Sequence, residues 1–154
     1  MARQGARQRA HYSPDVGQAR GDLYGKALGR AEAAFQSGFF LETIALVESL
    51  MADRLESVIS LLDGEPARFG TVGEAVHELK KRLSAVPGAQ DLPLFGAVTA
   101  WSRDRARWIH EFAKVPAAED LDWDERLEDA RRTAREGLDL LRQVTAETSR
   151  CMGQ

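Results

Sequence analysis

The 154-residue chain has a single cysteine, three histidines and no long run of apolar residues. Cys151 has no second cysteine to pair with, which excludes an intrachain disulfide. No stretch approaches the roughly 18 consecutive apolar residues that would span a membrane. The arginine-rich first residues are not followed by the hydrophobic segment of a secretory signal. We therefore expect a cytoplasmic protein that does not enter a membrane.

The sequence also lacks the motifs of the common catalytic and cofactor sites. It has no Cys-x-x-Cys, no His-Glu-x-x-His, no glycine loop before Lys-Ser/Thr and no dinucleotide-binding fingerprint. His11 lies in the terminal segment and His77 on the outer side of a helix, so a metal site built from imidazoles is not expected. No serine occupies the turn that a Ser-His-Asp hydrolase requires. We expect neither a metal nor a cofactor.

The composition indicates one globular domain. Hydrophobic residues make up 44% of the chain and charged residues 29%. The net charge of -3 argues against a strongly basic protein but not against a local basic site. We expect a helical domain over residues 17–150 and a flexible basic tail over residues 1–16. The tail is either a solvated terminus or an arm that adds affinity for phosphate.

Apolar residues recur at the three-and-four spacing of amphipathic helices, and no stretch alternates as a strand would. Turn signals such as Ser37-Gly38 and Asp63-Gly64 separate the periodic segments. The predicted helices cover residues 22–36, 39–62, 72–85, 93–114 and 123–149. The fold expected from these segments is all-α, an antiparallel bundle of four to five helices.

Small residues occupy every fourth position of the first helical segment: Gly17, Gly21, Gly25, Gly29, Ala33 and Ser37. Each glycine inside a helix costs about 1 kcal/mol relative to alanine, so this series would be costly on a plain surface. Either another helix approaches the strip closely, or the series is a coincidence in a partly frayed segment.

Two of the predicted helices each place one charge among core-facing residues. Arg105 interrupts the apolar stripe that includes Trp101 and Trp108, and Glu48 projects inside the apolar arc of the second helix. A buried guanidinium loses its hydration unless an acceptor pairs with it. We therefore predict a bidentate ion pair between Glu48 and Arg105 that would satisfy both groups. The pair either only fixes the register of two helices or also positions Arg105 beside a functional site.

Arg105 is followed, after four residues, by His110, in a run that begins with Trp101. This pattern resembles the motif of HEPN domains. HEPN domains are small, all-helical and often homodimeric, and many are metal-independent ribonucleases of toxin and antiviral systems. The stretch Leu41–Ser57 is similar to the first core helix of some HEPN branches, so the resemblance covers about residues 35–114. It implies a HEPN-like bundle.

Two positions depart from the family pattern. The residue after the arginine is usually polar in active members, most often asparagine, and here it is Ala106. Some members are controlled by AMP transfer to a tyrosine two places after the histidine, and here that position is Phe112. A phenyl ring has no hydroxyl to modify, so this mode of control is not expected.

The resemblance implies a metal-independent endoribonuclease of a toxin-antitoxin or antiviral defence system. RNA supplies its own nucleophile, the 2′-hydroxyl, so the enzyme needs a proton shuttle, His110, and a positive charge on the phosphate, Arg105. Glu48 would support Arg105, and the substrate contacts would come from Arg103, Arg107 and Lys114. Arg105 and His110 diverge by about 140° on one helix, so we expect a homodimer that brings both copies together.

A second interpretation is a HEPN-like helical module that has lost activity and binds a protein partner or RNA. Ala106 favours it, and so does the simpler role of Arg105 as a structural ion pair. A third is a subunit of a larger assembly, in which the small-residue strip and the basic tail contact an antitoxin or another defence protein.

Overall fold

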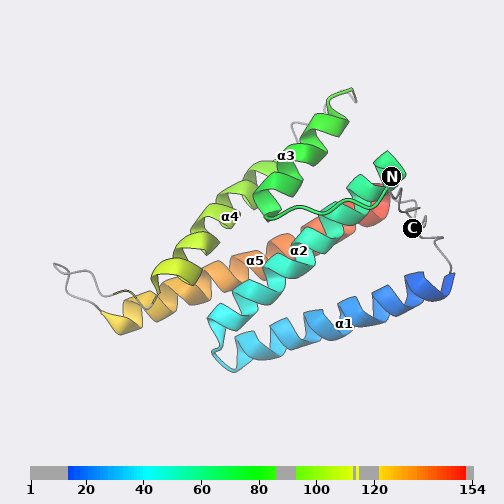
Figure 1. The fold of residues 1–154 in the computed structure, drawn as a ribbon. Helices are drawn as coiled ribbons and strands as arrows, with labels where there is room; N and C mark the ends of the chain where they lie inside the picture. Colours follow the sequence, from blue (N-terminus) through cyan, green and yellow to red (C-terminus); the bar gives the residue numbers. More distant parts are fainter. Residues whose placement is uncertain (1–13, 86–92, 113, 115–121, 152–154) are drawn as a thin grey trace, which may run out of the picture.

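We analysed a computed structural model of the chain, which describes residues 14–85, 93–112, 114 and 122–151 (Figure 1). The described residues form five helices and no strand: α1 (Pro14–Gln36), α2 (Phe40–Asp63), α3 (Val72–Leu83), α4 (Pro93–Glu111) and α5 (Trp123–Cys151). The prediction of an all-α fold is confirmed. The predicted bounds of α2 to α5 differ from the observed ones by three residues or fewer.

The first helix is longer than predicted. α1 begins at Pro14, inside the segment expected to be a tail over residues 1–16. Proline suits the first position of a helix, because its fixed φ is helical and its missing N–H has no helical partner there. The rest of the expected tail, residues 1–13, lies outside the described residues.

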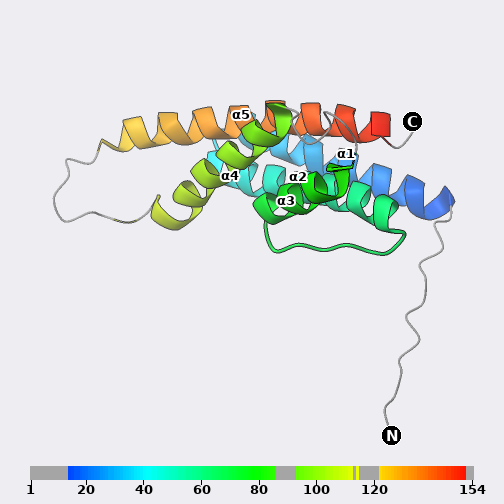
Figure 2. The ribbon, with the colours of Figure 1, turned by 90° about the horizontal axis from the view of Figure 1, so that it is seen from above.

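The expectation of a purely antiparallel bundle is wrong for two helix pairs. Figures 1 and 2 show α2, α3 and α5 running in one direction, with α1 and α4 running in the other. The cause is the connection over residues 64–71, which we call the return segment. It runs back along α2: the Ala67 N–H donates to Ser60 Oγ at 2.9 Å and the Phe69 N–H donates to Glu56 Oε1 at 2.7 Å. α3 therefore starts beside the middle of α2 and repeats its direction.

Local signals at both ends of the return segment explain where the helices stop and start. Gly64 ends α2 with a φ of 68°, a conformation that glycine adopts without strain. Thr71 caps α3 by accepting a hydrogen bond from the Glu74 N–H, while the Glu74 side chain accepts from the Thr71 N–H. This reciprocal capping box satisfies amides that the first helical turn leaves without partners.

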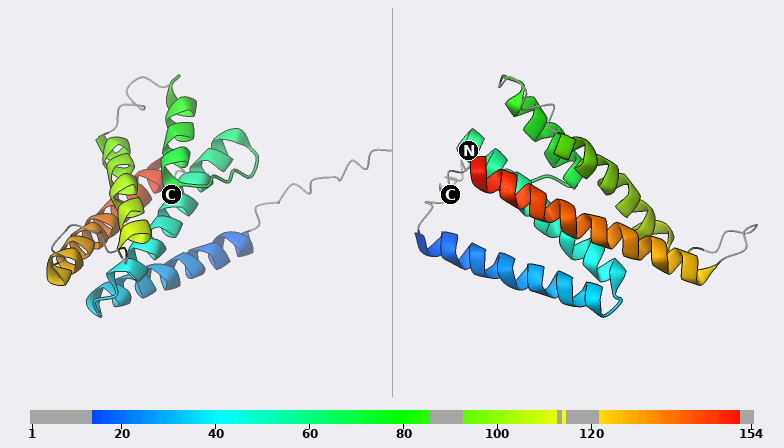
Figure 3. Two further views of the ribbon diagram at one scale, coloured as in Figure 1. Left: turned by 60° about the vertical axis from the view of Figure 1, so that its left-hand side comes forward. Right: turned by 180° about the vertical axis from the view of Figure 1, so that it is seen from behind.

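The five helices pack in three levels around one core. Figure 3 shows α2 and α5 side by side in the middle level, with α1 on one side and the α3–α4 pair on the other. Because α2 contacts α1, α3 and α5, it contributes the largest set of fully buried side chains. These are Thr43, Ile44, Val47, Met51, Leu55 and Ile59.

Trp101 fixes the contact between α4 and α5. Its side chain is fully buried, and its indole N–H donates to the Thr133 carbonyl at 2.8 Å. A Cβ added at Gly137 would lie 2.6 Å from the Trp101 ring, so α5 needs glycine there. Trp108 donates in the same way to Thr133 Oγ1 at 3.0 Å. α4 is therefore held firmly against α5 at the turns on either side of Arg105.

Three glycines of the small-residue strip of α1, Gly21, Gly25 and Gly29, do not lie against another described helix. In the described part of the structure, a Cβ added at Gly21, Gly25 or Gly29 would meet no neighbouring atom within 4 Å. The buried side of α1 carries Ala31 and Ala34 instead. The helices that the structure describes include no segment that is both long and apolar enough to cross a lipid bilayer.

Candidate functional site

Arg105 lies on the inner side of α4, as the apolar stripe predicts. Val98 and Trp101 precede it on the same side and are fully buried, and Trp108 follows at 7% exposure. Residues at this three-and-four spacing share one helix face, so Arg105 is directed toward the core rather than toward solvent.

The predicted pairing of Arg105 with Glu48 is confirmed, but the expectation that it would satisfy both groups is wrong for Arg105. A terminal nitrogen of Arg105 contacts Glu48 Oε1, and only 13% of the arginine side chain and 19% of the glutamate side chain are exposed. The pair joins α4 to α2 across the core. Arg105 Nε is buried and has no hydrogen-bond partner among the described residues, so this guanidinium is incompletely satisfied.

The electrostatics of the pair are dominated by its burial. Loss of hydration raises the pKa of Glu48 above its ordinary value of 4.5, and the positive charge of Arg105 opposes that rise without cancelling it. An ion pair that costs this much desolvation is a weak source of net stability. Removing only one partner is nevertheless costly, because it leaves the other charge buried and uncompensated.

His110 and the predicted substrate-binding residues lie on the outer side of α4. His110, Arg103 and Arg107 are exposed, at positions that follow one another by four and three residues along the helix. The Arg107 guanidinium lies 5.4 Å from the centre of the Trp108 ring. Lys114 follows the end of α4 and is also exposed. The structure thus brings the basic residues to the side of His110 but does not bring Arg105 to it.

The two departures from the HEPN pattern differ in their surroundings. Ala106 is partly buried, beside Arg105 in the sequence. The Phe112 ring packs edge-on against Trp108 and Trp123, with ring centres 6.0 and 5.0 Å apart. Phe112 therefore belongs to an aromatic cluster that joins the end of α4 to the start of α5, which gives this ring a packing role.

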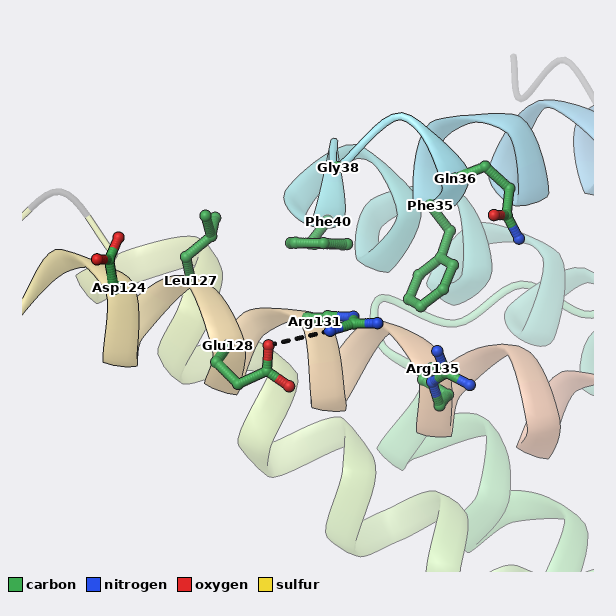
Figure 4. A pocket seen from close by; sticks show the side chains of 9 residues that line it. All are labelled: Phe35, Gln36, Gly38, Phe40, Asp124, Leu127, Glu128, Arg131 and Arg135. Carbon is green, nitrogen blue, oxygen red and sulfur yellow. Dashed lines mark hydrogen bonds and ion pairs between the residues drawn. The ribbon is translucent and has the colours of Figure 1, made fainter.

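Sequence reasoning missed a groove between the first half of α5 and the corner where α1 joins α2, which we call the α1–α2 corner (residues 35–40). It encloses about 510 Å³, and Figure 4 shows Phe35 and Phe40 above Arg131 and Arg135 of α5, with Leu127 pointing up beside Phe40. The two phenyl rings are tilted against each other with centres 5.5 Å apart. Two aromatic residues on either side of the Ser37-Gly38 break were the only signal in the sequence, because the arginines of α5 looked like ordinary surface charges.

The described residues include no group of three or more His, Cys, Asp and Glu side chains arranged to hold a metal ion. No family model matches the chain, and no curated protein or solved structure matches it either.

Proposed function

We propose that this chain is a non-catalytic, HEPN-like helical module that binds a protein partner. The observation that carries the proposal is the burial of Arg105 in its ion pair with Glu48. A guanidinium that stabilises the transition state of phosphodiester cleavage has to reach the phosphate. Arg105 faces the inside of the bundle, whereas His110 is on the exposed side of the same helix. One copy of the chain therefore does not bring Arg105 and His110 to a single phosphate.

The departure at Ala106 supports the same proposal. A polar residue after the arginine can donate to a phosphate or orient the catalytic groups, and a methyl side chain does neither. Arg105 and Glu48 then act as architecture: they hold the register between α2 and α4, while binding takes place on the outside of the bundle.

A metal-independent endoribonuclease is the second candidate function. It is favoured by the exposed basic side of α4, where Arg103 and Arg107 lie on the same side as His110, and by the exposed Lys114 after the end of the helix. Because Arg105 faces away from that side, the positive charge on the phosphate would have to come from Arg103 or Arg107, or from a second copy or a defence-complex partner. An antitoxin would then act by covering the same side of α4.

RNA cleavage distinguishes the two candidates. Single-stranded RNA is incubated with the purified full chain in EDTA, next to His110→Ala and, as a matched exposed-site control on the same helix, Asp104→Ala. We expect intact RNA in all three samples and no growth defect on expression of the wild type. Cleavage by the wild type and the control that His110→Ala abolishes would overturn the non-catalytic proposal. Arg105→Ala is a poor test of catalysis, because it also leaves Glu48 unpaired inside the bundle.

A further inference from the structure

We propose that the groove between the α1–α2 corner and α5 binds a short extended segment of a protein partner, which carries an acidic residue at one end, an apolar residue in the middle and a basic residue at the other end. This inference rests on the proposed binding function and names the surface and the chemistry of the partner. Its three recognition elements are Arg135, the Phe35–Phe40–Leu127 group and Asp124, all of which line the groove.

The groove continues beyond its widest part. A second hollow of about 390 Å³ shares Phe35, Gln36 and Arg135 with it and extends along the same side of α5 between α5 and α1. The two hollows together form an open channel rather than an enclosed cavity. An elongated ligand fits such a channel better than a compact cofactor, which is usually enclosed over most of its surface.

Arg135 is the cation available for an acidic group. The other two groove arginines already contact carboxylates: Arg131 contacts Glu128 at 3.3 Å, and Arg142 contacts Glu32 and Asp139 at 3.2 and 2.8 Å. The Arg135 guanidinium instead lies 5.1 Å from the centre of the Phe35 ring and has no carboxylate partner among the described residues. This cation–π contact holds the guanidinium beside the groove, where it can bind a carboxylate in a bidentate way.

Asp124 supplies the opposite charge at the other end of the groove. It lies in the first turn of α5 and has no cationic partner among the described residues. Arg135 is eleven positions after Asp124 in the sequence, a rise of about 16 Å along a helix. An extended chain covers that distance in about five residues. A basic and an acidic residue of the partner about five positions apart would therefore reach Asp124 and Arg135 together.

Phe35, Phe40 and Leu127 form the apolar middle of the groove. Figure 4 shows Leu127 pointing up from α5 between the two charged ends, toward the level of the Phe40 ring. Phe35 and Phe40 are only partly buried, although they pack against the core. A leucine or aromatic side chain of the partner would bury these surfaces and gain about 25 cal/mol for each Å² removed from water.

The charge balance favours a peptide over RNA in this groove. Asp124 and Glu128 oppose Arg131 and Arg135, so the lining carries no net charge. Nucleic-acid affinity depends on a local excess of positive charge. In this groove the two carboxylates would repel the phosphates of an RNA strand as much as the two arginines would attract them. A segment with both signs of charge matches the lining at both ends.

A random heptapeptide library on phage, selected against the full chain, tests the proposal. The best peptide is then synthesised with a fluorescent label, and its binding is measured by polarisation. We expect enriched peptides to carry an acidic residue, a central apolar residue and a basic residue, and Arg135→Glu to weaken binding at least about tenfold. The matched control is Arg132→Glu on the same helix, which faces away from the groove and contacts Asp129; it should change affinity less than twofold, as a rough limit.

A compensating charge reversal tests directly whether the groove recognises the charge of the peptide. Arg135→Glu should regain binding of the selected peptide when the acidic residue of that peptide is replaced by lysine, which a variant that merely misfolds would not do. The proposal is overturned if the enriched peptides lack the charge pattern, if Arg135→Glu leaves binding unchanged, or if a labelled single-stranded RNA binds the chain in an Arg135-dependent way. RNA cleavage is measured separately, so failure of the groove and failure of the non-catalytic function have different signatures.

Discussion

Arg105 and Arg82 both tie α2 to a neighbouring helix, but they do so in opposite electrostatic regimes. Arg105 reaches Glu48 inside the bundle, with 13% and 19% of the two side chains exposed. Arg82 lies between Asp63 at the end of α2 and Glu78 on α3, with 26%, 34% and 29% of the three side chains exposed. The inner arginine keeps one buried nitrogen without a partner, whereas the outer one donates from all three nitrogens.

The pKa shifts show what this difference means. Burial raises the pKa of Glu48 despite its arginine, while hydrogen bonds from Arg82 lower the pKa of Asp63 and of Glu78 below their ordinary values. Desolvation therefore outweighs attraction at the inner pair, and attraction outweighs desolvation at the outer cluster. The inner pair gives α2 and α4 a defined register at a cost, and the outer cluster closes the return segment at little cost.

The largest expected effect is the loss of one partner of the inner pair. Glu48→Ala should lower the free energy of unfolding by about 3 kcal/mol, because it removes the side chain that accepts the buried Arg105 guanidinium as well as its charge, whereas glutamine at this position would still offer an acceptor oxygen. Urea unfolding followed by circular dichroism measures the change. Ser49→Ala, at the exposed neighbouring position, is the control and should change stability by less than about 0.5 kcal/mol. A Glu48→Ala effect no larger than that of the control would show that Arg105 finds water or another acceptor.

Replacing both charges should restore most of that loss. Glu48→Leu combined with Arg105→Met removes the desolvation cost together with the attraction, and such replacements are often neutral or stabilising by about 1–4 kcal/mol. We expect the double variant to unfold at a higher urea concentration than Glu48→Ala and close to the wild type. A double variant as unstable as the sum of two single variants would mean that Glu48 and Arg105 are not coupled, so that the loss in Glu48→Ala does not come from an unpaired buried charge.

Arg82→Ala should have a smaller effect than Glu48→Ala. Asp63 and Glu78 lose their hydrogen-bond donor, but both remain accessible to water and can be hydrated. The expected change is a modest decrease in the urea midpoint. This difference from the wild type should become smaller in high salt, because salt screens partly exposed charges. Equal salt sensitivity of Arg82→Ala and Glu48→Ala would remove the distinction between the two regions.

The inner pair is also the feature of the site that the sequence predicted best. A charged side chain at a core-facing position needs a partner of opposite charge, and each of two helices had one such side chain. Glu48 and Arg105 could therefore be paired from the sequence alone. The direction of α3 could not be predicted in this way. It depends on Ser60 and Glu56, whose side chains accept hydrogen bonds from backbone amides of the return segment. Those residues look like ordinary polar positions on the outer side of α2.

The sequence indicated the start of α3 clearly, the close contact at Gly137 partly and the groove hardly at all. The Thr71-Val-Gly-Glu74 sequence is a capping box and marks the start of α3 directly. Gly137 in the middle of a long helix indicates close approach of another group, but only the structure identifies Trp101. The groove had almost no signal, since it depends on how the α1–α2 corner lies over α5. Side chains distant in sequence acquire a shared role there only through tertiary packing.

The smallest expected effect is a difference in pH dependence between the two regions. A raised folded-state pKa means that the contribution of Glu48 to stability is present below its ordinary value of 4.5 and is lost as pH rises through the raised value. A lowered pKa means that the contribution of Asp63 is present above its ordinary value of 3.8 and is lost as pH falls through the lowered value.

Glu48→Gln and Asp63→Asn should therefore have opposite pH profiles. Relative to the wild type, Glu48→Gln should gain stability as pH rises above 4.5, because the wild type then ionises a buried carboxyl and the variant does not. Asp63→Asn should gain relative stability as pH falls below 3.8, where the wild type loses its ionised partner for Arg82. Urea unfolding of the three proteins across this range measures both slopes. If the relative stability of both variants changed with pH in the same direction, the pKa of both carboxyls would be shifted in the same direction. Burial would then not distinguish the inner pair from the outer cluster.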